Sequence, residues 1–199
     1  MESVREAIDF IGGPGTLWIL AGVYFGSVIL ERLWAIRGNP HYDNADALCS
    51  IGLNLISSVL NLVIATLIPL ALYVLVFDQF RLLDDMALWL AIPLAFVLHE
   101  LAYYWDHRLG HRVGILWAFH AIHHSSNEFN HSTSARVFFL DGQLKALFAL
   151  PAALIGIDPV VYIAVSVLTN SFGIWNHASY IPRLGWLDRV LMSPKMHKA

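Results

Sequence analysis

Long apolar runs without a charged side chain are the feature that most limits how this chain can fold. The run over 47–77 contains no Asp, Glu, Lys or Arg, and it exceeds the about 20 residues that an α-helix needs to cross a bilayer. Hydrophobic residues make up 57% of the 199 residues and charged residues only 14%, against about 25% charged in ordinary soluble domains. Too few charges remain to cover a water-facing surface, so we expect much of the surface to face lipid.

This composition excludes several classes of protein. A disordered chain and a collagen-like repeat would both need far fewer apolar residues. The net charge of −3 argues against a basic nucleic-acid-binding protein. Cys49 is the one cysteine, so the chain has no internal disulfide framework.

The apolar runs predict an all-α fold, a multi-pass transmembrane helical bundle of about four spans. Spans are expected over 16–36 and 86–104, and 47–77 forms either one long tilted helix or a hairpin bent at Pro69. The run over 137–155 is interrupted by polar residues. A turn is expected at Gly156, Asp158 and Pro159, after which 160–175 is expected to return across or into the membrane. Polar residues at helical spacing within 47–77 predict a helix–helix contact, namely Asn54, Ser57, Ser58 and Asn61.

The distribution of positive charge predicts an orientation. One side, formed by the loops after the first and third spans and by the C-terminal segment, carries nine positive residues: Arg32, Arg37, Arg108, Arg112, Arg136, Arg183, Arg189, Lys195 and Lys198. The other side carries only Arg5 and Arg81. Because positive charge favours the cytoplasmic side, we expect the histidine-rich loops and the C-terminus to face the cytoplasm.

Ten histidines are unusual in so apolar a chain. His107 and His111 lie four residues apart, which places both rings on one helix face. An HxxHH group follows at His120, His123 and His124. On the same predicted side of the membrane the chain continues to His177 and His197. Clustered imidazoles at helical spacing predict a metal site and suit iron, zinc, copper or nickel rather than magnesium or calcium.

Several kinds of metal site compete for these histidines. The string HELAY at 99–103 begins like a zinc-protease motif, but Tyr103 stands where the second histidine should be. A haem protein has no use for adjacent histidines, and a metal transporter more often places its ligands within the spans. A pair of irons with an all-imidazole shell fits several short histidine motifs best. A non-enzymatic membrane protein that binds or transports metal is the alternative.

The histidine motifs resemble those of the sterol desaturase and fatty acid hydroxylase superfamily of membrane non-haem di-iron oxygenases. That family has HxxxH, then HxxHH, then a further HxxHH. The first two stand here within YYWDHRLGH and LWAFHAIHHSS, and FNHSTSAR resembles the alkylglycerol monooxygenase-like branch. His177, in WNHASY, matches a further family histidine, and the third box is expected to begin at His197 with two histidines directly after Ala199. We therefore expect a fragment of a longer protein.

The resemblance implies the function and the partners. The protein would hydroxylate or desaturate a lipid (a sterol, a fatty acyl chain or an ether lipid) with O2 at two Fe ions. The implied metal ligands are His107, His111, His120, His123, His124, His177 and His197. Electrons would come from a separate electron-donor protein, since no flavin, haem or nicotinamide motif appears in the sequence. The histidine-box oxygenase domain would cover 95–199 and the N-terminal membrane-spanning region 1–94. A bacterial inner membrane and an endoplasmic reticulum would both fit.

Other side chains are candidates for supporting roles. A ligating histidine usually donates its second N–H to a carboxylate or carbonyl. The nearby acids are Glu100, Asp106, Glu128 and Asp141, and the first two are expected to fill this role. His99 is expected to be a supporting group or a satisfied residue at a helix end. Arg108 and Arg136 are expected either to bind a lipid headgroup or to pair with the acids. Four aromatic residues belong either to a headgroup-level belt or to the substrate cavity: Tyr103, Tyr104, Trp105 and Trp117.

Overall fold

Every regular element in the described part of the chain is a helix, which confirms the all-α prediction. The structure is a computed structural model, and it describes residues 2–38, 42–64, 67–178, 180–189 and 193–198. The α-helices are α1 (Glu2–Ile11), α2 (Thr16–Gly38), α3 (Asn44–Ile64), α4 (Leu67–Phe80), α5 (Leu88–Gly110), α6 (Gly114–His120), α7 (Gln143–Phe148), α8 (Leu150–Ile155), α9 (Pro159–Gly173) and α10 (Pro194–Lys198). The 3-10 helices are η1 (His123–Ser125), η2 (His131–Ala135), η3 (Ile174–His177) and η4 (Gly185–Arg189).

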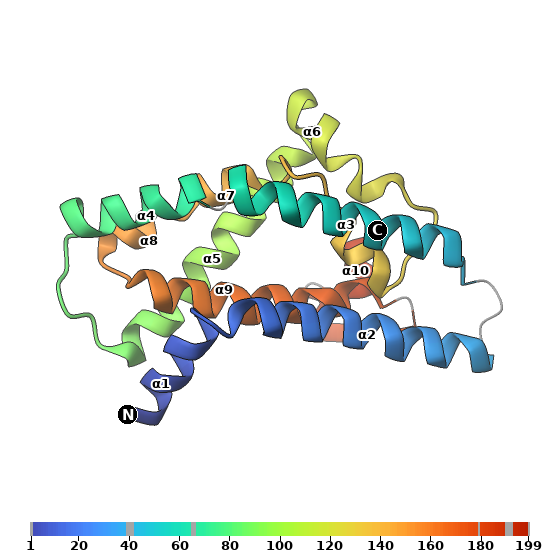
Figure 1. Cartoon of the computed structure of the whole chain (residues 1–199), viewed down its shortest axis with the longest axis horizontal. Coiled ribbons are helices and arrows are strands. Elements are labelled where there is room, and N and C mark those ends of the chain that lie inside the picture. Colours follow the sequence, from blue (N-terminus) through green and yellow to red (C-terminus); the bar gives the residue numbers. More distant parts are fainter. Residues whose placement is uncertain (1, 39–41, 65–66, 179, 190–192, 199) are drawn as a thin grey trace.

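The long apolar run over 47–77 does not fold back as a hairpin. In Figure 1, α3 and α4 follow one another along one long edge of the molecule. Pro69 lies inside α4 and not at a turn between two antiparallel helices. Helix α3 ends at Ile64 and α4 begins at Leu67, and residues 65–66 lie outside the described residues. Of the two alternatives, the single long helix is therefore closer to the structure than the hairpin.

The opposite long edge is formed by α2 and α9, which pack against each other. Between the two edges runs α5, which contacts α9 along one part and α7 along another. The segment 160–175 is expected to return across or into the membrane. Helix α9 has 15 residues and is about 22 Å long at 1.5 Å per residue, shorter than the about 30 Å hydrocarbon core. Its buried residues include Val161 and Val165. Helix α9 is thus a central packing helix of the fold.

Two of the described helices are long and apolar enough to cross a membrane. They cover Thr16–Ala35 and Leu88–Gly110, and shorter apolar helices cover Ile68–Phe80 and Gln143–Ile155. Many large apolar side chains are exposed, for example Trp18 at 80% and Trp89 at 77%. Exposed apolar side chains in this number favour contact with a membrane.

The turn predicted at Gly156, Asp158 and Pro159 is confirmed. Gly156 has a φ of 109°, a left-handed conformation that glycine adopts without a steric penalty. The Asp158 side chain then caps α9 by accepting the backbone N–H groups of Val160 and Val161. Pro159 follows at the first helical position, where its missing N–H costs nothing.

Candidate metal centre

The ends of two helices bring the first two histidine motifs together. His107 lies in the last turn of α5 and His111 directly follows that helix, whereas His120 ends α6. The His120 ring packs against Gly110, where a Cβ atom would lie 3.2 Å from Cγ of the ring. The absence of a side chain at Gly110 therefore allows α6 to approach the end of α5. The ring centroids of His107 and His120 are 4.6 Å apart.

All seven histidines predicted as ligands lie in two adjoining groups. In each group, one ring nitrogen of every member lies within 4.8 Å of those of the others. The four-histidine cluster consists of His107, His111, His120 and His124, and the three-histidine cluster of His123, His177 and His197. The clusters touch, since the rings of His120 and His123 are 5.5 Å apart and those of His107 and His197 are 5.9 Å apart.

The adjacent residues His123 and His124 belong to different clusters. They lie in the short helix η1, where successive side chains point about 120° apart. His124 returns to the side of His120, four residues earlier, and the Nε2 atoms of the two rings are 3.2 Å apart. His123 points instead toward His177, with ring centroids 5.0 Å apart. The HxxHH motif therefore serves both clusters.

In the four-histidine cluster, a carboxylate orients one ring. Both carboxylate oxygens of Asp141 lie within hydrogen-bond distance of His120 Nδ1, at 3.1 and 3.2 Å. Because a carboxylate accepts, Nδ1 carries the proton. Its Nε2 then presents a lone pair to the cluster, which is the form of imidazole that coordinates a metal.

In the three-histidine cluster, uncharged groups orient the rings. The backbone carbonyl of Arg136 accepts from His123 Nδ1 at 3.3 Å. The Thr133 hydroxyl donates to the Asn130 carbonyl at 2.8 Å and lies 3.3 Å from His177 Nδ1. With its proton committed to that carbonyl, the hydroxyl accepts from Nδ1. Both histidines therefore keep the Nε2 lone pair for the cluster.

The rings are held in their neutral form. Burial, followed by repulsion from neighbouring imidazoles, lowers the pKa of both His123 and His124 to about 4. Neutral imidazole is the ligating form. Near pH 7 the rings of His123 and His124 are therefore already neutral, and a metal can bind them without first displacing a proton.

The two acids expected to support the ligands are placed elsewhere. Asp106 accepts the backbone N–H of Lys145 at 3.0 Å, and the Glu100 residue is exposed on α5. Asp141, which the sequence ranked below them, is the acid that contacts a cluster histidine. Asp141 reaches His120 from 21 residues away along the chain, a contact that only the fold brings about.

Arg136 is enclosed in the fold, so the headgroup role considered for it does not hold. Its residue is 4% exposed. The guanidinium pairs with the Asp46 carboxylate at 2.6 Å and donates to the Ser50 and Ser125 hydroxyls. Asp46 also accepts from the Ser126 hydroxyl at 2.7 Å. This buried network ties the start of α3 to the segment that supports His123.

Sequence reasoning missed a second buried polar group, which holds η2. The Asn130 side chain accepts the backbone N–H groups of Ser132 and Thr133, and Thr133 completes a capping box. From α2, Glu31 accepts the backbone N–H of His131 at 2.6 Å. The spacing of Asn130 and Thr133 is a capping-box-like signal that could have predicted this helix start.

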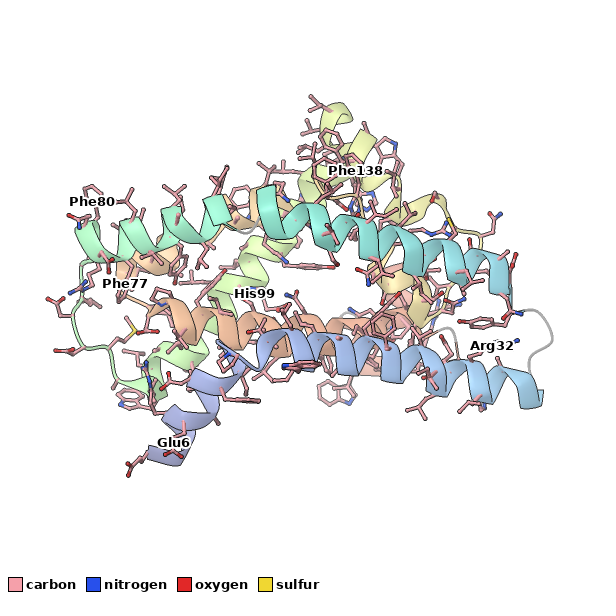
Figure 2. All side chains as sticks on the ribbon, in the orientation of Figure 1. Glu6, Arg32, Phe77, Phe80, His99 and Phe138 are labelled. Carbon is pink, nitrogen blue, oxygen red and sulfur yellow. The ribbon has the colours of Figure 1, made fainter. Side chains whose placement is uncertain are left out.

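His99 and the aromatic residues take distinct positions. His99 is buried in the middle of α5 (Figure 2), not at a helix end, and its Nδ1 lies 3.0 Å from the Ser166 hydroxyl. Tyr103 stacks on His107, and Trp117 stacks on His124. Tyr104 and Trp105 are about half exposed, at 49% and 47%. Tyr103 and Trp117 therefore contact cluster histidines, although at 41% and 42% they are nearly as exposed as the other two.

Comparisons with known proteins agree with the histidine motifs. Alkylglycerol monooxygenase from Homo sapiens is 33% identical over 182 residues, which are 88% of this chain and 40% of that protein. The Danio rerio protein of the same name is 31% identical over the same shares. Ornithine lipid hydroxylase OlsE from Rhizobium tropici is 31% identical over 116 residues, 58% of this chain and 35% of that protein.

The chain thus spans about 40% of the length of the first curated relatives that it matches. No solved structure matches it. The family model for fatty acid hydroxylases matches residues 92–199, which include both histidine clusters. This chain belongs to the fatty acid hydroxylase family.

Proposed function

We propose that this chain forms part of a membrane-bound non-haem di-iron oxygenase that uses O2 to hydroxylate a lipid. The observation that carries the proposal is the convergence of seven imidazoles in two adjoining clusters. Two relatives of this chain are named as a monooxygenase and a lipid hydroxylase. The proposal combines this donor set with the activities of those relatives.

The donor set fits two iron ions. One ion would be held by His107, His111, His120 and His124, and the other by His123, His177 and His197. Imidazole suits iron and other late transition metals. Two irons bound there would supply the activation of dioxygen and the oxidation of an unactivated C–H bond.

The protein's own part is to orient ligands and to restrict water. Asp141, the Arg136 carbonyl and the Thr133 hydroxyl hold three rings with Nε2 toward the clusters. Phe129 stacks on His177 with ring centroids 4.9 Å apart, and Trp117 covers His124 at 5.8 Å. These aromatic faces shield single rings from water, whereas His111 and His124 remain exposed residues.

The proposed site lies in a lipid bilayer and receives electrons from a separate protein. The exposed apolar side chains of α2 and α5 suit contact with lipid tails. We propose a multi-pass topology of about four spans, with the histidine clusters on the cytoplasmic side. There a separate electron-donor protein would reach them. Residues 95–199 would be the oxygenase unit and 1–94 the membrane-spanning region, with contacts such as Arg136 to Asp46 crossing this boundary.

Isotope labelling tests the reaction directly. The full-length protein would be produced in a host supplied with alkylglycerol or ornithine lipids under 18O2, and the lipids analysed by mass spectrometry. Hydroxylation adds one 18O atom to the substrate, whereas desaturation removes two hydrogens and adds no label. The His120→Ala variant should abolish either product, because His120 lies in the four-histidine cluster and touches the other.

The same experiment separates the enzyme from a metal carrier. Labelled lipid from the wild type and none from His120→Ala would support the oxygenase. Metal flux into vesicles with unchanged lipids would overturn it in favour of a transport protein. Equal labelling by both proteins would overturn the assignment of His120.

A further inference from the structure

The two histidine clusters adjoin, but groups of different charge support them. Asp141 presents both carboxylate oxygens to His120 in the four-histidine cluster. The Asp141 side chain is 16% exposed and that of His120 is 7% exposed. A carboxylate this shielded from water retains much of its electrostatic effect on the ring that it contacts.

Asp141 is also part of a small charged group. Lys145 interacts electrostatically with Asp106, Asp141 and Glu100. The Lys145 ammonium lies over the Tyr103 ring, 5.6 Å from its centroid. Among these three carboxylates, Asp141 is the one that contacts a cluster histidine within the described hydrogen bonds.

The supports of the three-histidine cluster carry no net charge. His123 is held by a backbone carbonyl and His177 by a hydroxyl. Arg136, whose backbone carbonyl supports His123, pairs through its guanidinium with Asp46 at 2.6 Å, so these two charges neutralise each other. Dipoles orient these rings, whereas a full charge orients His120.

We propose that the two positions bind divalent metal with unequal affinity and that Asp141 makes the four-histidine position the tighter one. The carboxylate lies one imidazole away from the ion, raises the basicity of the His120 ring and offsets the positive charge of the metal. Asp141 is thus a positioning residue that acts through His120. The inference rests on the proposed function only in that the clusters bind metal, and it requires no turnover.

A metal titration of the full-length protein in detergent tests this. The protein is freed of metal by chelation and titrated with Co2+ under anaerobic conditions, followed by calorimetry and visible absorption. The wild type should bind in two steps. Asp141→Asn keeps an acceptor oxygen but removes the charge, and it should weaken the tight step about 10- to 100-fold. The weak step should stay within about threefold, because its supports are unchanged.

Three further variants assign the steps. His111→Ala should remove the tight step and His177→Ala the weak one. Asp141→Glu restores the charge and should recover most of the tight affinity, which distinguishes a charge effect from a folding defect. Thr133→Val, which removes the hydroxyl beside His177, should weaken only the second step.

Specific outcomes would overturn the proposal. Wild-type affinities in Asp141→Asn, a loss confined to the weak step, or no recovery in Asp141→Glu would each do so. Two-step binding with no lipid oxidation would overturn the proposed function and leave this inference standing. Lipid oxidation with two equal sites would do the reverse.

Discussion

The two ends of the molecule are held together by different interactions. At the apolar end, α1, α4, α8 and α9 meet around small or branched residues such as Ala152, Ala153, Ile157 and Val161. At the histidine end, η2 and η3 are held by buried hydrogen bonds, with Glu31, Asn130 and Arg136 almost fully enclosed. The contrast separates two tasks: close packing keeps helices together, and directional polar bonds aim imidazoles.

This division has a physical basis. Alanine side chains let helix backbones approach closely, which favours dispersion contacts but fixes no ring orientation. Hydrogen bonds to Nδ1 define both the tautomer and the direction of Nε2. A metal centre therefore needs the second kind of interaction, and a helical scaffold is served by the first.

The largest expected effect comes from removing ligands at the histidine end. The double variant His120→Ala/His123→Ala takes one ligand from each cluster. Lipid oxidation should fall by more than the about 10- to 100-fold that loss of a supporting group costs. Metal content by mass spectrometry and labelled lipid measure this. His131→Asn is the control, because His131 is buried outside both clusters and its Nδ1 contacts only the Ser27 carbonyl among the described hydrogen bonds. Equal losses in the control would contradict the division.

A break in the buried ion pair should cost the most stability. Arg136→Met leaves the Asp46 carboxylate without its cation, where the side chains are 5% and 18% exposed. Removing one partner of such a pair costs about 3 kcal/mol. Unfolding in detergent, followed by circular dichroism, measures it. Metal occupancy should also fall, because the backbone carbonyl that supports His123 loses the side-chain contacts that hold its segment in place.

The double variant Arg136→Met/Asp46→Asn sharpens that test. Without the carboxylate, the methionine no longer leaves a charge unpaired, so much of the lost stability should return. If the double variant is less stable than Arg136→Met, the unpaired charge of Asp46 is not the cause of the lost stability.

Overpacking should affect the apolar end alone. Ala152→Leu inserts a larger side chain where the residue is fully buried, and it should lower the free energy of unfolding by about 1–3 kcal/mol. Metal affinity should stay at the wild-type value. Ala45→Leu, at an exposed position of α3, is the matched control. Loss of metal in Ala152→Leu would indicate that the two ends are coupled.

The smallest effect is expected where α3 meets the segment after η2. Ser57 donates to the Val137 carbonyl at 2.6 Å from a buried position. Ser57→Ala should lower the free energy of unfolding by about 1 kcal/mol. Ser58→Ala is the control, because Ser58 is exposed and bonds to Asn54 within the same helix. Similar losses in both variants would argue against a role for the Val137 contact. Within the polar row predicted in this helix, Ser57 thus contacts a loop, whereas the Asn54 side chain contacts Tyr24 of α2.

Local spacing along the chain was enough to predict part of this protein. The apolar runs predicted helices, and the intervals within HxxxH and HxxHH predicted imidazoles that meet, because i,i+3 and i,i+4 neighbours share a helix face. The turn at Gly156 followed from local backbone preferences. Each of these depends on residues within a few positions of one another.

Only the tertiary structure decided the rest. The contact of Asp141 with His120 and that of Arg136 with Asp46 join segments 21 or more residues apart. The assignment of His123 and His124 to different clusters depends on such long-range contacts as well. Packing against α1, α2 and α5 also decided that α9 lies inside the helix bundle, which its composition does not reveal. Sequence spacing determines which side chains can meet locally, whereas long-range packing determines which of them face the same metal and with what charge behind them.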